Sequence, residues 1–135
     1  MRSTTNRSTL AVHGGERRSK SGHAVAEPIV QTATFSFKTS AEVRAYQEEE
    51  YKTRFEYGRY GSPTQLVLES KLAALYQTED AVVTSSGMAA VASVFLCCLK
   101  SGDHVVVARA VFGAIRYVVE EILPRFGIAN TIVDG

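Results

Sequence analysis

The second half of the chain alternates short β-branched runs with segments at helical spacing, and this alternation restricts the possible folds more than any other feature. Residues 104–108 and 128–133 have the pattern of apolar strands. Residues 112–123 between them form an amphipathic pattern closed by Pro124 and Gly127. Two strands joined by a helix pair in parallel. We therefore predict an α/β fold with a parallel-rich sheet and helices on both faces.

The region before these strands carries the signals of two further helices. Ser62, Pro63 and Gln65 give a capping serine, a proline at the first helical position and a glutamine three residues after the cap. A helix is predicted to begin here and to end near Gln77. Residues 81–84 are β-prone, residues 85–87 are small, and residues 88–99 have the composition of a buried helix. We interpret this order as strand, tight loop and helix.

The first sixty residues are polar and show little periodicity. Thr39 and Glu42 have the spacing of a capping box, which predicts a short surface helix over residues 40–50. We expect residues 1–60 to form an extended N-terminal arm with this helix, and residues 61–135 to begin an α/β domain. The chain ends directly after a strand, where such a fold starts its next crossover helix. We therefore interpret it as the front part of a larger, truncated fold.

Composition narrows the functional classes. Fifteen Lys and Arg against fourteen Asp and Glu leave a formal charge of +1, which excludes a nucleic-acid binder that depends on bulk charge. The longest apolar runs are shorter than the roughly 20 residues of a membrane span, and the N-terminus lacks the pattern of a secretory signal. Cys97 and Cys98 are adjacent, and the histidines show no ligand spacing. We expect a cytoplasmic protein with no metal site and no membrane partner.

Two local patterns suit a phosphate group. Ser86, Gly87 and Met88 stand between a predicted strand and a helix, where small residues let backbone N–H groups point at an anion. A simple tight connection is the alternative. Tyr57 and Arg59 are two residues apart and would project to the same side of an extended segment, offering a phenol and a guanidinium together. An aromatic surface loop with a solvated arginine is the alternative there.

Phe112 is a third candidate. It follows the strand that ends near Ala108, at the carboxyl edge of the predicted sheet, where the ligands of open α/β folds lie. Its ring therefore has two interpretations, which are stacking on a flat cofactor and packing in the core.

Four segments taken together resemble a known family. Residues 10–15 and 27–35 look like its opening, residues 57–64 (YGRYGSPT) look like its Y-x-R-x-x-N-P-T motif, and residues 86–88 look like its S-G-M phosphate loop. The family is that of the cysteine and methionine metabolism enzymes that use pyridoxal 5'-phosphate (PLP). The resemblance corresponds to the N-terminal third of such an enzyme. It implies the first part of a fold-type I PLP-transferase large domain.

The resemblance also implies a cofactor site shared between subunits. Residues 86–88 would bind the phosphate of their own subunit's cofactor, whereas Tyr57 and Arg59 would reach the phosphate held by a neighbouring subunit. Phe112 would stack on the pyridoxal ring in place of the family's usual tyrosine. The arm would wrap a partner in a homo-oligomer, a dimer of dimers. No catalytic residue is expected in this chain, because none of its five lysines matches the motif of the family's reactive lysine.

The local segments point to more than one reaction within the family. Residues 55–61 and 122–128 resemble the cystathionine γ-synthase branch, which implies trans-sulfuration by γ-replacement on an O-acylhomoserine with cysteine, in methionine biosynthesis. Residues 111–113 instead resemble the O-succinylhomoserine sulfhydrylases, which use another sulfur nucleophile. Methionine γ-lyases carry a cysteine two residues after the stacking aromatic, where this chain has Ala114. A further alternative is a catalytically inactive chain that acts only as an interaction partner.

Overall fold

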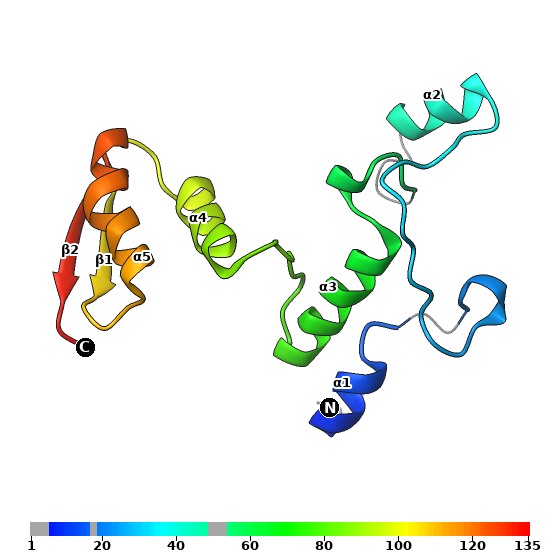
Figure 1. The fold of residues 1–135 in the computed structure, drawn as a ribbon, viewed down its shortest axis with the longest axis horizontal. Helices are drawn as coiled ribbons and strands as arrows, with labels where there is room; N and C mark the ends of the chain where they lie inside the picture. Colours follow the sequence, from blue (N-terminus) through cyan, green and yellow to red (C-terminus); the bar gives the residue numbers. More distant parts are fainter. Residues whose placement is uncertain (1–5, 17–18, 49–53) are drawn as a thin grey trace. The chain divides into compact units, whose positions relative to one another are not determined.

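Five α-helices and two β-strands lie in the residues that the computed structural model describes, which are 6–16, 19–48 and 54–135 (Figure 1). The chain divides into two units, Met1–Val83 and Thr84–Gly135, each with its own internal contacts. This border lies after residue 83, whereas the sequence pattern changes at residue 60. The division into an arm over residues 1–60 and a domain that begins at residue 61 stays a prediction. Among the described helices, none is long and apolar enough to cross a membrane.

Helices α1 (Arg7–His13) and α3 (Pro63–Tyr76) pack against each other in the first unit. Asn6 caps α1 by accepting a hydrogen bond from the N–H of Ser8 at 3.0 Å. Gly15, with φ +70°, lets the chain leaving α1 touch α3, because a Cβ there would lie 2.4 Å from the carbonyl carbon of Ser70. The sequence pattern does not predict α1, since seven residues with few apolar side chains depend on α3 for their stability.

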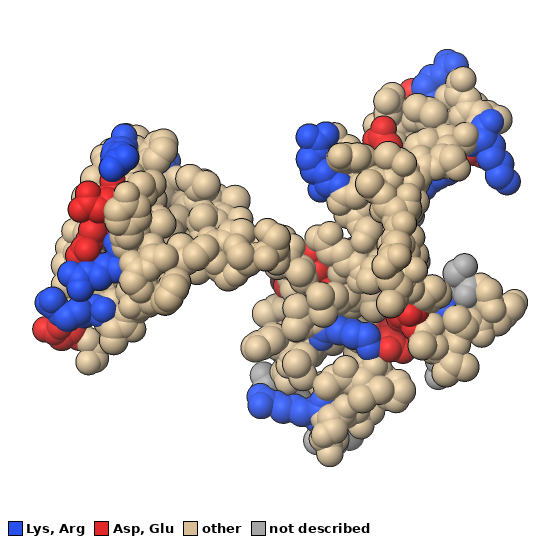
Figure 2. All heavy atoms as spheres, viewed as in Figure 1, with Lys and Arg blue, Asp and Glu red and all other residues tan. Residues whose placement is uncertain are grey.

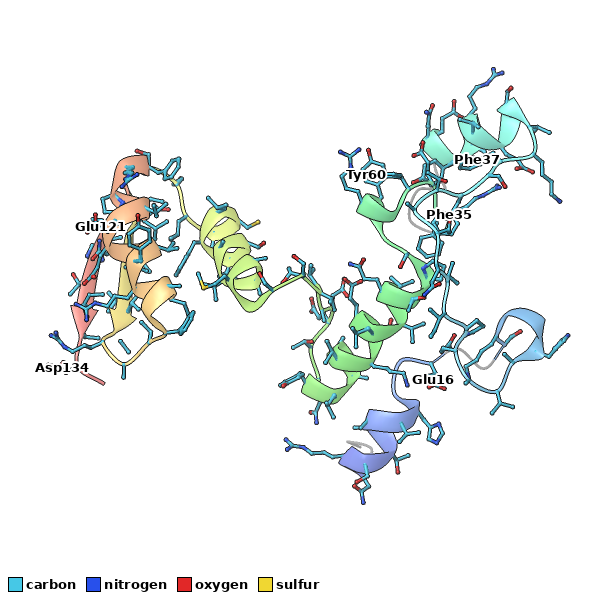
Figure 3. All side chains as sticks on the ribbon, in the orientation of Figure 1. Glu16, Phe35, Phe37, Tyr60, Glu121 and Asp134 are labelled. Atoms are coloured by element: carbon cyan, nitrogen blue, oxygen red, sulfur yellow. The ribbon has the colours of Figure 1, made fainter. Side chains whose placement is uncertain are left out.

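An ion-pair network fastens the chain after α1 to α3. Lys71 donates from its Nζ to the carboxylate of Glu16 and to the carbonyl of Val12, and Lys20 donates to the second carboxylate oxygen at 3.1 Å. Hydrogen bonds from Lys71 and then Lys20 lower the pKa of Glu16 from 4.5 to about 2. Figure 3 labels Glu16 beside α3. The N-terminal segment is therefore held to α3 by charge as well as by packing.

Helix α2 (Ser40–Glu48) confirms the surface helix predicted from residue 40, while residues 49–50 of that prediction lie outside the described residues. Thr39 Oγ1 accepts from the N–H of Glu42 at 3.2 Å, and the Glu42 carboxylate accepts from the N–H of Lys38 at 2.8 Å. This is a capping box displaced by one residue. The N–H of Lys38, and then Arg54, lower the pKa of Glu42. Tyr46, on the inner side of α2, is buried.

The predicted start of α3 is confirmed. Ser62 Oγ accepts from the N–H of Gln65 at 3.2 Å, Pro63 is the first helical residue, and the helix ends where Gln77 adopts a left-handed conformation. The strand predicted over residues 81–84 is wrong for this chain, since these residues are not in a strand. The N–H of Val83 donates to Glu69 Oε1 at 3.0 Å instead of to a neighbouring strand. A β-prone run needs a partner strand to become one.

The second unit confirms the predicted parallel sheet. Strands β1 (His104–Ala108) and β2 (Ala129–Val133) pair in parallel, with Val105 opposite Asn130 and Val107 opposite Ile132. One face of this pair packs on a core of three buried side chains, Val119, Leu123 and Ile128. The opposite face is open in this unit, where Val106 is 61% exposed.

The crossover between the strands is helical, as predicted, but it changes type along its length. Helix α5 (Gly113–Tyr117) passes into a π-helical turn over Val118–Ile122 and then into a 3-10 turn over Leu123–Phe126. The side-chain amide of Asn130 donates to the carbonyl of Val119 at 3.0 Å, so β2 satisfies a carbonyl within the wide turn. The single helix predicted over residues 112–123 is thus corrected to three helical segments.

Helix α4 (Gly87–Cys98) confirms the predicted helix, although it is not buried in this unit. Phe95 and Leu99 pack on the core, whereas Leu96 is 68% exposed and Cys97 and Cys98 are also exposed. The difference arises because no segment of Thr84–Gly135 covers the rest of its surface. Figure 2 shows basic and acidic side chains interspersed on the visible face of both units, in keeping with the near-zero net charge.

Candidate functional site

A short ladder between residues 33–35 and 56–58 fixes the backbone of the first site. The N–H of Phe35 donates to the carbonyl of Glu56 at 2.9 Å, and the N–H of Gly58 donates to the carbonyl of Ala33 at 2.7 Å. Thr34 and Tyr57 therefore form an antiparallel bridge. Tyr57 is extended, as predicted, with φ −146° and ψ 140°. These hydrogen bonds fix the position of Tyr57 opposite Thr34.

The structure brings Tyr57 and Arg59 together, but not in the predicted way. A 3-10 turn, Gly58–Tyr60, follows Tyr57, so the expected extended segment ends before Arg59. The guanidinium carbon of Arg59 lies 5.4 Å from the Tyr57 ring centroid and 5.1 Å from the Tyr60 ring centroid. Sequence reasoning missed Tyr60. In a 3-10 turn the side chains of residues i and i+3 lie over each other, so a turn assumed after Tyr57 would have placed Tyr60 near it.

A hollow of about 460 Å³ lies beside this cluster, and Arg59 is one of the residues that line it. The others are Thr34, Phe35, Phe37, Val43, Glu56, Tyr57 and Tyr60. Three of these residues, Phe35, Phe37 and Tyr60, are labelled in Figure 3. An exposed guanidinium beside phenol groups can donate several hydrogen bonds to a phosphate or a carboxylate. The hollow therefore suits an anionic group.

Thr64, the last residue of the YGRYGSPT motif, has a role that its sequence position does not reveal. Its hydroxyl oxygen accepts a hydrogen bond from the N–H of Val30 at 2.9 Å, thirty-four residues away in sequence. Phe35 and Phe55 also stack, with ring centroids 5.4 Å apart. These contacts join the segment before α2 to the start of α3 and support the loop that carries Arg59.

The N-terminus of α4 is the second candidate site. Ser86 Oγ accepts from the N–H of Ala89 at 3.1 Å, which leaves the Ser86 hydroxyl hydrogen free to donate. Within the described hydrogen bonds, the N–H groups of Gly87 and Met88 have no acceptor, as expected for the first residues of a helix. A Cβ built on Gly87 would meet nothing within 4 Å. Open N–H groups at the positive end of a helix fit a phosphate.

Phe112 lies at the carboxyl edge of the parallel strands, as predicted. It is the residue before α5, it is 70% exposed, and its carbonyl accepts from the N–H of Ile115 at 2.9 Å. The ring does not pack in the core of Thr84–Gly135, and its stacking on a cofactor stays a prediction. The ring is available to contact a flat ligand.

A further pair at this edge was missed by the sequence analysis. The N–H of Arg109, directly after β1, donates to the carbonyl of Val133 at 2.7 Å, and its side chain forms an ion pair with Asp134. The two strand ends are thus tied together. Within the described part of the chain, no three His, Cys, Asp or Glu side chains are grouped to hold a metal ion.

One protein family matches most of the chain, including both candidate sites. The model of the family "Cys/Met metabolism PLP-dependent enzyme" matches residues 8–135. The chain belongs to this family, whose cofactor is PLP.

The relatives carry out different reactions within the family. The chain is 38% identical over 128 residues to cystathionine gamma-synthase 1, chloroplastic, of Arabidopsis thaliana, covering 93% of the chain and 23% of that protein. It is 42% identical over 127 residues to an L-methionine gamma-lyase of Fusobacterium nucleatum, covering 93% and 31%. The crystal structure of metB from Corynebacterium glutamicum is similar with a TM-score of 0.82 and 30% identity, covering 97% of the chain and 32% of that structure. The chain thus spans about a quarter to a third of these relatives.

Proposed function

We propose that the chain forms the N-terminal part of a PLP-dependent trans-sulfuration enzyme of the cystathionine γ-synthase type. Such an enzyme replaces the acyl group of an O-acylhomoserine with the sulfur of cysteine. The family match over residues 8–135 is the observation that supports a PLP-dependent enzyme of this family, and the 38% identity to a cystathionine gamma-synthase supports this particular type. The adjacent free cysteines, Cys97 and Cys98, support a reducing cytoplasm as its location.

The N-terminus of α4 and Phe112 would hold the cofactor. The backbone N–H groups of Gly87 and Met88 and the hydroxyl of Ser86 would donate to its phosphate, with the helix dipole adding to the attraction. The exposed ring of Phe112 would stack on its pyridine ring. When bound, PLP withdraws electrons from an attached amino acid. The chain's own residues orient this group and hold its charge.

Tyr57 and Arg59 would donate to the cofactor phosphate of a neighbouring subunit. Both side chains are at the surface of the first unit, where Tyr57 is 40% exposed and Arg59 is also exposed. This assignment requires at least a dimer, and a dimer of dimers is the assembly we propose. The bridge between Thr34 and Tyr57 would keep the pair in place for the partner.

Residue 114 is the local feature that favours γ-replacement over γ-elimination. The methionine γ-lyases of the family carry a cysteine there, and this chain has Ala114. Overall identity does not separate the two reactions, because relatives of both kinds match the chain to a similar extent. O-succinylhomoserine sulfhydrylase activity, with a sulfur nucleophile other than cysteine, is the second candidate, because residues 111–113 resemble those enzymes.

An inactive interaction partner is a candidate of another class. None of the five lysines lies in a sequence like that around the family's reactive lysine, and α4 exposes apolar side chains such as Val94 and Leu96. A chain of this length would then contribute only Tyr57 and Arg59 to a complete subunit. We propose that the 135 residues alone have no activity.

The deciding experiment uses the protein produced from its natural gene. Its intact mass is measured first, and PLP binding is followed by absorbance. The protein is then supplied with an O-acylhomoserine and either cysteine or sulfide. Cystathionine as the product supports the first proposal, and homocysteine supports the sulfhydrylase. A mass several times 14.7 kDa is expected. A mass of 14.7 kDa without PLP absorbance would overturn the enzyme proposal in favour of the interaction partner.

Arg59→Ala with Arg44→Ala as its control tests the role of the guanidinium. Arg44 is an exposed arginine of α2 outside the cluster. We expect Arg59→Ala to weaken PLP binding by roughly tenfold or more, since charge-assisted hydrogen bonds to the phosphate are lost. Arg44→Ala should bind PLP like the parent. Equal PLP binding by both variants would contradict the assignment of Arg59.

A further inference from the structure

Tyr60 lies against Arg59 although the phosphate proposal gives it no role. The Arg59 guanidinium carbon is 5.1 Å from the Tyr60 ring centroid, and Arg59 Nη2 is 3.4 Å from the Tyr60 hydroxyl. The rings of Tyr57 and Tyr60 meet edge to face, with centroids 6.4 Å apart and an interplanar angle of 70°. The guanidinium is therefore in contact with two aromatic rings that also contact each other.

The backbone explains why the two rings meet. A 3-10 helix has three residues per turn, which places the side chains of residues i and i+3 over each other. The N–H of Tyr60 donates to the carbonyl of Tyr57 at 2.9 Å and closes such a turn. Gly61, with φ +126°, ends it in a conformation that favours glycine. Because the ladder fixes Tyr57, the turn also fixes Tyr60.

Arg59 needs this support more than a buried arginine would. An arginine at the surface has many rotamers, and it loses this freedom when it binds an anion. Aromatic rings attract a guanidinium through their π-faces and leave its N–H groups able to donate. Contact with two fixed rings therefore reduces the number of conformations that Arg59 must give up. Among the described hydrogen bonds, only its Nη2 donates, to the Tyr60 hydroxyl at 3.4 Å.

We propose that Tyr60 is a positioning residue, which holds the guanidinium of Arg59 ready for the phosphate of a phosphorylated ligand. The proposal rests on the proposed function, in which that ligand is PLP. The hollow of about 460 Å³ beside the cluster gives the phosphate space. Glu56 also lines this hollow, and its carboxylate would repel an incoming anion. A guanidinium held in a fixed position would offset this repulsion.

The test compares Tyr60→Leu with Tyr60→Phe in the protein produced from its natural gene. Phenylalanine keeps the aromatic face, whereas leucine keeps apolar contact without it. Binding of PLP and of unphosphorylated pyridoxal is measured by absorbance titration. We expect Tyr60→Leu to weaken PLP binding by roughly two- to fivefold, the range typical of one exposed cation–π contact, and Tyr60→Phe to bind PLP like the parent. Pyridoxal binding should be the same in all three proteins.

Each result has one meaning. Unchanged PLP binding in Tyr60→Leu, or an equal loss for PLP and pyridoxal, overturns the positioning role while leaving the proposed function intact. A parent protein that binds neither ligand overturns the proposed function itself. Adding Tyr60→Leu to Arg59→Gln should have no further effect on PLP binding if Tyr60 acts through Arg59. Tyr60 is 66% exposed, so folding should survive, and Tyr60→Gln replaces the leucine variant if melting shows otherwise.

Discussion

Lys71 on α3 holds Glu16, fifty-five residues away in sequence, through a direct ion pair between its ammonium group and the Glu16 carboxylate. The same lysine also donates to the carbonyl of Val12, so one side chain joins both the backbone of α1 and the charge of the segment after it to α3. Lys20 completes the network from the other side of the carboxylate. The Glu16 carboxylate is thus the ionised group through which charge adds to the packing of the N-terminal segment on α3.

The pH dependence of this attachment follows from the pKa of Glu16. Its folded pKa of about 2 is below the unfolded value of 4.5, so its stabilising effect is complete above about pH 4.5 and is lost as the pH falls toward 2. Glu16→Gln should therefore lower the urea midpoint at pH 6, and the difference from the parent should shrink by pH 3. Glu79→Gln, at an exposed carboxylate after α3, is the control. A pH-independent difference for Glu16→Gln would contradict this attachment.

Gly15→Ala should disrupt the contact between α1 and α3. The added Cβ would lie 2.4 Å from the carbonyl carbon of Ser70, and the residue would also have to adopt φ +70°. Gly22→Ala is a matched control, because Gly22 has φ +66° with nothing within 4 Å of the added atom. The control should cost about 1 kcal/mol from backbone strain alone, and Gly15→Ala should cost clearly more. Urea unfolding of the two variants measures the difference in the free energy of unfolding. Equal losses of stability would show that the close approach of Gly15 to Ser70 does not contribute to stability.

Ser62→Ala should destabilise α3 by about 1 kcal/mol, because the cap on the N–H of Gln65 is lost. Ser62→Asn should retain the stability of the parent, since asparagine caps a helix equally well and is the usual residue of the family's motif. Thermal unfolding compares the three proteins. A loss in the asparagine variant as large as in the alanine variant would mean that the serine contributes something other than a cap.

Phe112→Ala should weaken PLP binding if the exposed ring stacks on the cofactor, whereas Phe112→Tyr should leave the affinity near that of the parent. Tyrosine keeps the ring that phenylalanine offers at this edge, and alanine removes it. PLP titration of the protein produced from its natural gene measures both. Unchanged binding in the alanine variant would remove Phe112 from the site.

The sequence predicted those elements that are formed by contacts between neighbouring residues. The cap at Ser62, the surface helix from Ser40 and the helix after Ser86 are each formed by contacts within four residues, and all three are present. Parallel pairing of residues 104–108 with 129–133 also followed from the strand, helix, strand order.

The misses depend on distant contacts. Helix α1 needs α3, and residues 81–84 lack a partner strand in this unit, so a β-prone run stays unpaired. The contact of Arg59 with two rings required knowledge of the turn after Tyr57, which the sequence indicated only as extended. For the site, the residue types were predictable, whereas Tyr60, Thr64 and the Arg109–Asp134 pair became visible only in three dimensions.

The pairing of residues 33–35 with 56–58 has a consequence for how sequences of this kind can change in length. A change of length in the connection, which contains α2, leaves the hydrogen bonds of the ladder itself in place, because they join only residues 33–35 and 56–58. A one-residue deletion within residues 33–35 or 56–58 shifts the alternation of sides, which would turn Tyr57 to the opposite face. Within the two segments, a change of length therefore moves Tyr57 even where the remaining residues are similar.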